Sequence, residues 1–179
     1  DLTGKRVVIV GGGNVAMDAA RVSRRLGATE ARVVYRRGRD EMPAHHVEAK
    51  DAEAEGATFE FLVNPTAIVS EGNKVTGITL QKMRLGEPDA SGRRRPEPVP
   101  NSDYTIAADM VITTIGMGPD ADPYTSLVGT AVGNRIKVDA KTLQTEQEWL
   151  FAAGDVSTGA SDITRAIGAG RRAAHMVDR

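Results

Sequence analysis

Short apolar runs alternate with amphipathic stretches along the first third of the chain. The runs have the length of buried strands, and the stretches between them have the period of helices. The pattern predicts strands over residues 6–10, 31–35 and 58–63 and helices over residues 14–26 and 42–55. Strands and helices that alternate in this order predict a βαβαβ unit with a parallel sheet.

The first predicted helix has a regular apolar spacing, and both helices have clear ends. Gly27 and Gly56 follow the helices as C-terminal caps, and Pro43 stands at the start of the second helix. Four apolar residues of the first helix recur at spacings of 4, 3 and 4 and so share one face: Val15, Ala19, Val22 and Leu26.

The middle of the chain predicts a small meander and a further strand. Residues 67–70 and 75–82 form a strand pair around a turn at residues 71–73. Residues 85–102 are rich in proline and glycine and are predicted as a long loop or hairpin tip. A buried strand is expected over residues 109–116, where it ends in a glycine.

The last part of the chain predicts a second strand and helix. A short apolar strand over residues 149–155 ends in Gly-Asp, and a helix over residues 163–177 begins at Ser161 or Asp162. Asp155, just past the strand end, is placed to accept hydrogen bonds from a sugar hydroxyl or a ribityl chain. Without that context, it is equally well interpreted as a turn residue.

The whole pattern predicts a three-layer α/β fold. A central parallel sheet carries helices on one face and a small antiparallel β-meander on the other.

Composition narrows the class of protein. The 179 residues carry a net charge of −1, 40% apolar residues and no cysteine. Such a chain has no electrostatic reason to bind nucleic acid or a membrane, and no apolar run has the length of a membrane span. Lack of cysteine excludes iron–sulfur ligation within this sequence. We expect a cytoplasmic protein, interpret His45 and His46 as a solvated helix face, and take the start at Asp1 to indicate a piece of a longer protein.

Gly11, Gly13 and Ala16 form a G-x-G-x-x-A pattern between the first strand and the first helix. The chain must leave the strand sharply at Gly11, and a side chain at Gly13 would block a phosphate. Ala16 permits close packing of the helix on the strand. Because the first N–H groups of a helix have no partner within it, they can donate to an anion. The pattern therefore predicts a site for a dinucleotide pyrophosphate.

Arginines follow the second predicted strand, where dinucleotide folds recognise the ribose 2′ group. Arg36, Arg37 and a third candidate, Arg39, offer forked, permanently charged donors that match a phosphate. An acidic residue there would instead favour NAD. The position therefore favours NADP, although a run of charge by itself is more often a solvated loop.

Two further segments are candidates for ligand contact. Small residues after the predicted strand at 109–116 would let a ligand approach the backbone at the edge where open α/β sheets bind ligands. A plain turn there is the alternative. The run Arg93, Arg94 and Arg95 lies among prolines. It is interpreted as a solvated tip, in preference to a contact for a phosphate or a partner protein.

Several motifs together resemble the small subunit of glutamate synthase and its relatives, which are flavoproteins related to the pyridine nucleotide-disulfide oxidoreductases. They are Gly-Gly-Gly-Asn-Val-Ala-Met-Asp18, Val-Val-Tyr-Arg-Arg37, Glu-Met-Pro-Ala44, Lys-Met-Arg-Leu-Gly-Glu-Pro-Asp89, Arg-Arg-Arg-Pro-Glu-Pro-Val-Pro100 and Phe-Ala-Ala-Gly-Asp155. The resemblance covers essentially the whole chain. It implies a Rossmann-like FAD/NAD(P)-binding fold in which residues 1–119 form an NADPH-binding domain and residues 120–179 are the incomplete C-terminal portion of the FAD-binding domain.

The resemblance implies roles for individual residues. For the NADPH pyrophosphate it implies Gly11, Gly13, Asn14, Val15 and Ala16, and for the 2′-phosphate Arg36 and Arg37. Near the nicotinamide half it implies Thr114, Ile115 and Gly116, and for FAD Gly154, Asp155 and the backbone of Ile163. No catalytic side chain is implied, because hydride transfer between two cofactors needs no protein acid or base.

The resemblance also implies a reaction and what this chain lacks for it. NADPH would pass a hydride to FAD, and electrons would then pass to iron–sulfur centres, a large subunit or a ferredoxin. The flavin-binding half with its own glycine turn and the cysteine-rich region that such proteins carry are absent from this sequence. We therefore expect this piece to bind NADPH, to hold FAD poorly and to be inactive alone.

Other function classes stay open from the residues alone. A nucleotide-sensing module without redox chemistry and a ferredoxin:NADP reductase-type subunit of another pathway are two alternatives. A self-contained short-chain dehydrogenase is disfavoured because no tyrosine is followed four positions later by lysine.

Overall fold

The computed structural model describes residues 1–88, 92–118, 120, 124 and 135–178. The chain divides into two compact units, Asp1–Gly116 and Met117–Arg179. Each unit is described by itself.

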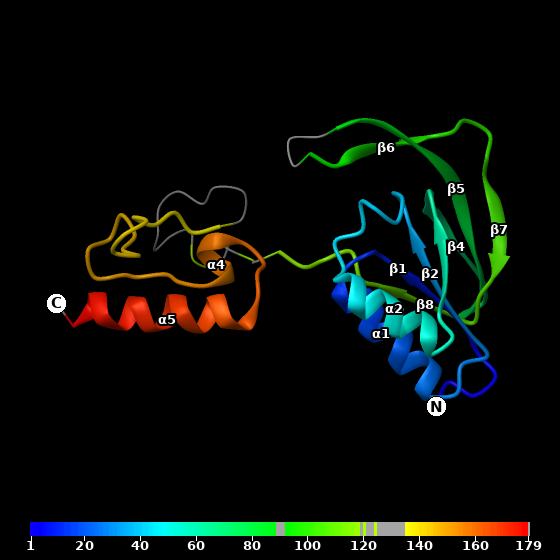
Figure 1. Cartoon of the computed structure of the whole chain (residues 1–179), viewed down its shortest axis with the longest axis horizontal. Coiled ribbons are helices and arrows are strands. Elements are labelled where there is room, and N and C mark those ends of the chain that lie inside the picture. The colour runs from blue at the N-terminus through cyan, green and yellow to red at the C-terminus, as the bar shows by residue number, and fades with distance from the viewer. Residues whose placement is uncertain (89–91, 119, 121–123, 125–134, 179) are drawn as a thin grey trace. The chain divides into compact units, whose positions relative to one another are not determined.

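A parallel sheet forms the centre of the first unit. Its strands are β1 (Arg6–Val10), β2 (Glu30–Tyr35), β3 (Thr58–Phe61) and β8 (Met110–Thr113), in the spatial order β3-β2-β1-β8. Helices α1 (Asn14–Arg25) and α2 (His46–Ala54) connect the first three strands and lie on the same face of the sheet (Figure 1). The predicted βαβαβ unit is confirmed.

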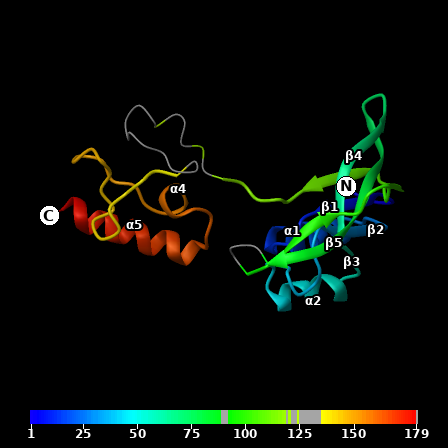
Figure 2. The same cartoon turned by 90° about the horizontal axis from the view of Figure 1, so that it is seen from above.

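An antiparallel sheet covers the other face of the parallel sheet (Figure 2). It is built from β4 (Val63–Glu71), β5 (Lys74–Pro88), β6 (Arg94–Pro98) and β7 (Tyr104–Ala107). Val8 and Val34 of the parallel sheet form one buried cluster with Val63, Ile78 and Leu80 of the antiparallel one. This confirms the predicted three-layer α/β fold with helices on one face and a meander on the other.

The packing face of α1 differs from the one that its apolar spacing indicated. The residues buried against the sheet are Ala16, Met17, Ala20 and Ser23, whereas Val15, Val22 and Leu26 are about half or more exposed. Apart from Met17, the buried face consists of small residues, which let the helix axis lie close to the strands.

Helix α2 begins at His46, later than the predicted residue 42. The Tyr35 hydroxyl donates to the Glu41 carbonyl, and the Ala44 N–H donates to the Gly12 carbonyl. These bonds hold the segment before the helix against the glycine turn. His45 caps the helix, its ring stacked on that of His46, and the end at Gly56 (φ 88°) agrees with the prediction.

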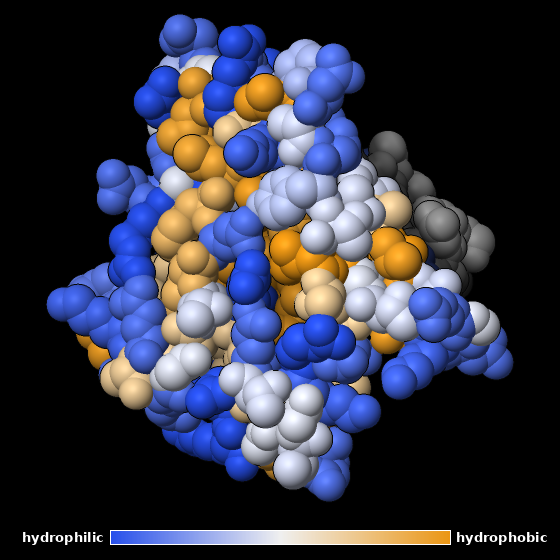
Figure 3. Space-filling view, turned by 90° about the vertical axis from the view of Figure 1, so that its right-hand side faces the viewer, coloured by the Kyte–Doolittle hydropathy of each residue, from blue (hydrophilic) through white to orange (hydrophobic). Residues whose placement is uncertain are grey.

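The proline-rich segment folds as a hairpin. Strand β5 continues to Pro88, and β6 pairs with it, Met83 opposite Pro98 and Leu85 opposite Pro96. The prolines are tolerated because β6 is an edge strand. Exposed apolar residues remain on this sheet, among them Ile68, and the face seen in Figure 3 shows apolar areas divided by hydrophilic ones.

The described part of the second unit has a small core and the helices α4 (Asp155–Thr158) and α5 (Ile163–Val177). Its buried apolar residues among those described are Ile136, Leu143 and Ala152. The predicted helix start is confirmed, because the Asp162 carboxylate accepts a hydrogen bond from the Arg165 N–H. The predicted strand over residues 149–155 is wrong. Only a single bridge between Gln144 and Phe151 forms, too little pairing to make a strand.

Candidate functional site

A cavity of about 920 Å³ lies at the carboxyl ends of the parallel strands. Its walls come from the end of β1, the turn before α1, the end of β2, the first half of β4 and the segment after β8. All of these belong to the first unit. This edge of an open α/β sheet is where such folds bind ligands.

The three glycines of the turn have different reasons for being glycine. Gly11 has φ 144°, and a Cβ there would lie 2.4 Å from the Thr114 hydroxyl oxygen. A Cβ at Gly12 would lie 2.7 Å from the Tyr35 ring. At Gly13, φ is −92° and a Cβ would meet no atom within 4 Å. The fold thus requires glycine at the first two positions, while the space beside Gly13 is open to the cavity.

The start of α1 is prepared for an anion. The helix has no side-chain cap and no acidic residue in its first turn. The Asn14 side-chain oxygen instead accepts a hydrogen bond of 2.8 Å from the His45 N–H, which joins the starts of the two helices. Val15 lines the cavity, whereas Ala16 is fully buried behind it. Amides at such an end carry the positive pole of the helix.

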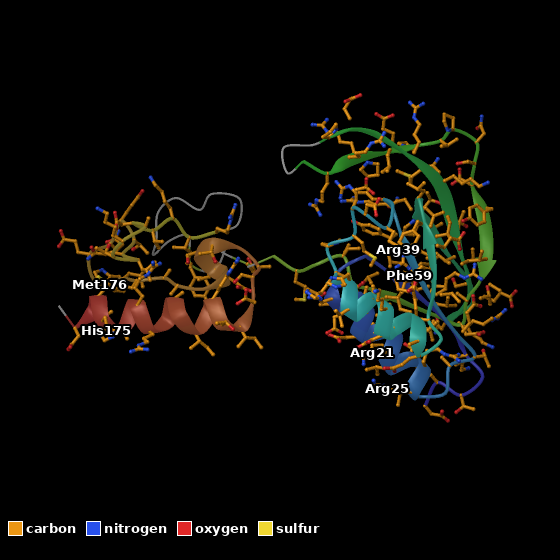
Figure 4. The ribbon with its side chains drawn as sticks, viewed as in Figure 1. Arg21, Arg25, Arg39, Phe59, His175 and Met176 are labelled. Atoms are coloured by element: carbon orange, nitrogen blue, oxygen red, sulfur yellow. The ribbon has the colours of Figure 1, made fainter. Side chains whose placement is uncertain are left out.

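Two of the three candidate arginines line the cavity. Arg36 is exposed, and Arg37 is only 6% exposed, with its Nε donating to the Arg94 carbonyl at 2.8 Å. Arg39 is not among the residues that line the cavity, and it lies near Phe59 (Figure 4). It forms an ion pair with Glu53, and its guanidinium lies 5.7 Å from the centre of the Phe59 ring. The candidate role of Arg39 in phosphate recognition is therefore not supported by its position.

The segment after β8 also reaches the cavity. The Thr114 hydroxyl donates to the Val10 carbonyl at 2.8 Å, which holds the segment beside the end of β1. Ile115 and Gly116 follow, both exposed and both lining the cavity. The cavity thus brings together eight of the predicted site residues: Gly11, Gly13, Val15, Arg36, Arg37, Thr114, Ile115 and Gly116.

The remaining candidate residues lie in the second unit. Gly154 has φ 74° and precedes α4. The Asp155 carboxylate is exposed and accepts a hydrogen bond from the Ser161 hydroxyl at 3.3 Å. Ile163, the first residue of α5, is exposed. Asp155 is therefore a helix-start residue near a second helix start, an arrangement that leaves its other oxygen available to a hydroxyl donor.

Sequence reasoning missed two contributions to the cavity. Residues 63–68 at the start of β4 form one wall, and Arg93 also lines the cavity, although the arginine run was interpreted as a solvated tip. The β4 wall had no signal in the sequence, since its residues carry no recognisable motif. Among the described residues that line the cavity, the only charged ones are Arg36, Arg37 and Arg93.

Among the described residues, the groups with shifted pKa values lie outside the cavity lining, and most of them belong to ion pairs. The Arg6 guanidinium and backbone N–H hold the pKa of Asp109 well below its usual range. Hydrogen bonds from Arg25 and Arg21 lower the pKa of Glu55 to about 2. Burial and the Glu60 carboxylate raise the pKa of Tyr104.

Within the described ranges of the chain, no group of three or more His, Cys, Asp or Glu residues could hold a metal ion. In the same ranges, no helix has the length and apolar character needed to cross a membrane.

Known proteins resemble this chain over nearly its full length. A family model described as pyridine nucleotide-disulphide oxidoreductase matches residues 1–172. The beta subunit of an NADP(+)-dependent formate dehydrogenase from Moorella thermoacetica is 47% identical over 178 residues, which are 99% of this chain and 25% of that protein. The small chain of the NADPH glutamate synthase from Halomonas elongata is 39% identical over 177 residues, 96% of this chain and 37% of that protein. The chain thus spans between about a quarter and two fifths of these relatives.

A solved structure agrees with the fold. The thioredoxin reductase of T. acidophilum superposes with a TM-score of 0.79 at 23% identity, over 98% of this chain and 52% of that one. At this identity the likeness is evidence for the fold alone.

Proposed function

The chain belongs to the pyridine nucleotide-disulphide oxidoreductase family, and from that premise we propose that its first unit binds NADPH for a flavin-dependent oxidoreductase. The pyrophosphate would lie against Gly11, Gly13 and the opening amides of α1. The open space beside Gly13, next to a helix start without a cap, is the observation that carries this proposal. The names of the two relatives, each NADP- or NADPH-dependent, support it.

We propose that Arg36 and Arg37 recognise the 2′-phosphate of NADPH. Both line the cavity at the end of β2, the position that reads the ribose 2′ group in dinucleotide folds. Guanidinium groups match a phosphate with paired donors. Thr114, Ile115 and Gly116, on the cavity wall beyond β1, would then border the nicotinamide half.

The second unit fits a share in FAD binding. Asp155 has an exposed carboxylate suited to a ribityl hydroxyl, and Gly154 and the backbone of Ile163 adjoin it. Bound FAD supplies an acceptor for the hydride of NADPH and an outlet for single electrons. The chain's own contribution is to bind and orient the nicotinamide and to exclude water from it. We propose that iron–sulfur centres, a large subunit or a ferredoxin receive the electrons in regions outside this chain.

Titration calorimetry of the whole chain with NADPH and with NADH tests the proposal. We expect NADPH to bind at least about tenfold more tightly, since one charge-assisted hydrogen bond is worth about 1.5–3 kcal/mol. Arg36→Ala should weaken NADPH by about one to two decades and leave NADH unchanged. Equal affinity for both coenzymes, or no binding of either, would overturn the assignment. Visible absorption of the purified chain tests the FAD part, and little bound flavin is expected.

A nucleotide-sensing module is the competing function for the same cavity. The exposed Asp155 beside the start of α5 favours the redox function, because a sensor has no use for a flavin contact. Adding the flavin-binding remainder of the protein should produce NADPH-dependent flavin reduction. A sensor would show binding without it.

A further inference from the structure

We propose that Arg93, from the hairpin of β5 and β6, is a third residue of the site that selects the 2′-phosphate of NADPH. This rests on the proposed binding of NADPH. Arg93 lines the same cavity as Arg36 and Arg37, although it lies far from them in the sequence.

The hairpin is tied to the end of β2 beside Arg93. The Nε of Arg37 donates to the carbonyl of Arg94, the residue that follows Arg93. Just beyond β2, the Arg37 carbonyl accepts from the Leu62 N–H, and the Leu62 carbonyl accepts from the Met83 N–H of β5. Figure 1 shows the hairpin crossing beyond the strand ends. The backbone next to Arg93 is therefore fixed to the place where the ribose 2′ group is read.

The three arginines of the run have different surroundings. Arg94 donates through Nε and Nη2 to the carbonyls of Gly86 and Leu85, so its side chain closes the hairpin on itself. Arg95 is exposed and is not among the residues lining the cavity. Arg93 alone of the three lines it. The run thus divides into one cavity residue, one hairpin residue and one solvent-facing residue.

The charge of the cavity fits a dianion. Its described lining carries three arginines and no carboxylate. In the proposed complex, the start of α1 and the glycine turn would balance the charge of the pyrophosphate, which leaves the arginines for a second phosphate. A phosphate can accept hydrogen bonds from guanidinium groups on β2 and on the hairpin at the same time, because it has several charged oxygens. A 2′-hydroxyl has a single uncharged oxygen and gains much less from the same donors.

Arg93→Ala and Arg95→Ala form the test, because both side chains are exposed and only Arg93 lines the cavity. Calorimetry would measure NADPH, NADH, adenosine 2′,5′-bisphosphate and adenosine 5′-monophosphate with each variant. We expect Arg93→Ala to weaken NADPH and the bisphosphate about tenfold or more, with NADH and the monophosphate within about twofold of wild type. Arg95→Ala should match wild type for all four, and both variants should melt as wild type does.

Three results would overturn the proposal, and they separate it from the function on which it rests. If wild type prefers NADPH and Arg93→Ala keeps the full preference, Arg93 is not part of the site while the proposed function stands. If Arg93→Ala weakens NADPH and NADH equally, it acts on the pyrophosphate or on the fold. If wild type shows no preference for NADPH, the proposed function itself is wrong.

Discussion

Replacing Gly13 by alanine is expected to weaken NADPH binding while leaving the fold nearly unchanged. The backbone at Gly13 suits any residue, and an added Cβ would meet no protein atom within 4 Å. Because alanine is a poorer N-cap than glycine, we expect a loss of less than about 1 kcal/mol, or less than about 8 °C in Tm. A methyl group forced against a bound pyrophosphate should cost about 1–3 kcal/mol, so the affinity for NADPH should fall about 10- to 100-fold.

Gly11→Ala is the matched control in the same turn. There the new Cβ would lie 2.4 Å and 2.7 Å from two oxygens of Thr114, at φ 144°. The strained backbone alone costs about 1–3 kcal/mol, so this variant should lose stability far more than Gly13→Ala. Thermal unfolding and calorimetry on both variants separate the two effects. Wild-type NADPH affinity in Gly13→Ala, or equal destabilisation of the two variants, would refute the distinction between a glycine for the fold and a glycine for the ligand.

Three further predictions concern residues outside the cavity. Asp109→Asn should lower the free energy of unfolding at neutral pH, because the carboxylate accepts two hydrogen bonds from the Arg6 guanidinium and one from the Arg6 backbone N–H. The difference in stability from wild type should shrink as the pH falls below about 4, where Asp109 of the unfolded wild-type chain binds a proton. The pKa of Glu55 is lowered from 4.5 to about 2, so its ion pairs contribute their full stability above pH 4.5 and lose it as the pH falls toward 2. The urea midpoints of wild type and Glu55→Gln should therefore converge over that range. A difference between the two midpoints that stays constant with pH would count against this role of the ion pairs. Arg39→Ala should leave the affinities for NADPH and NADH unchanged and lower Tm slightly, since exposed ion pairs and cation–π contacts are each worth about 1 kcal/mol or less; a selective loss of NADPH affinity would return Arg39 to the site.

The strand–turn–helix that opens the chain was predictable because its signals are local. The apolar run, Gly11 and Gly13 each constrain the backbone where they stand. The same holds for the start of α5, which Asp162 caps within its own turn. Local capping and turn chemistry therefore predicted these elements to within one or two residues.

The failures depend on contacts distant in sequence. The buried face of α1 is chosen by how closely the sheet approaches, which the spacing of Val15 and Val22 does not reveal. Arg93 lines the cavity in a hairpin whose Arg94 carbonyl accepts a hydrogen bond from Arg37, a contact distant in sequence that no local pattern encodes. Arg39 stands beside the predicted phosphate site in sequence, yet Phe59 and Glu53 draw it to the helix side.

Ala16 was predicted to contact the coenzyme, but it is fully buried and lies outside the cavity lining. Because its methyl group packs between α1 and the sheet, its size limits how closely the first turn of the helix can approach the strands. A bulkier residue there, such as valine, would lift the donor amides away from a diphosphate without removing any atom that touches it. Mutational scans confined to cavity-lining positions would overlook such an effect on the proposed coenzyme site.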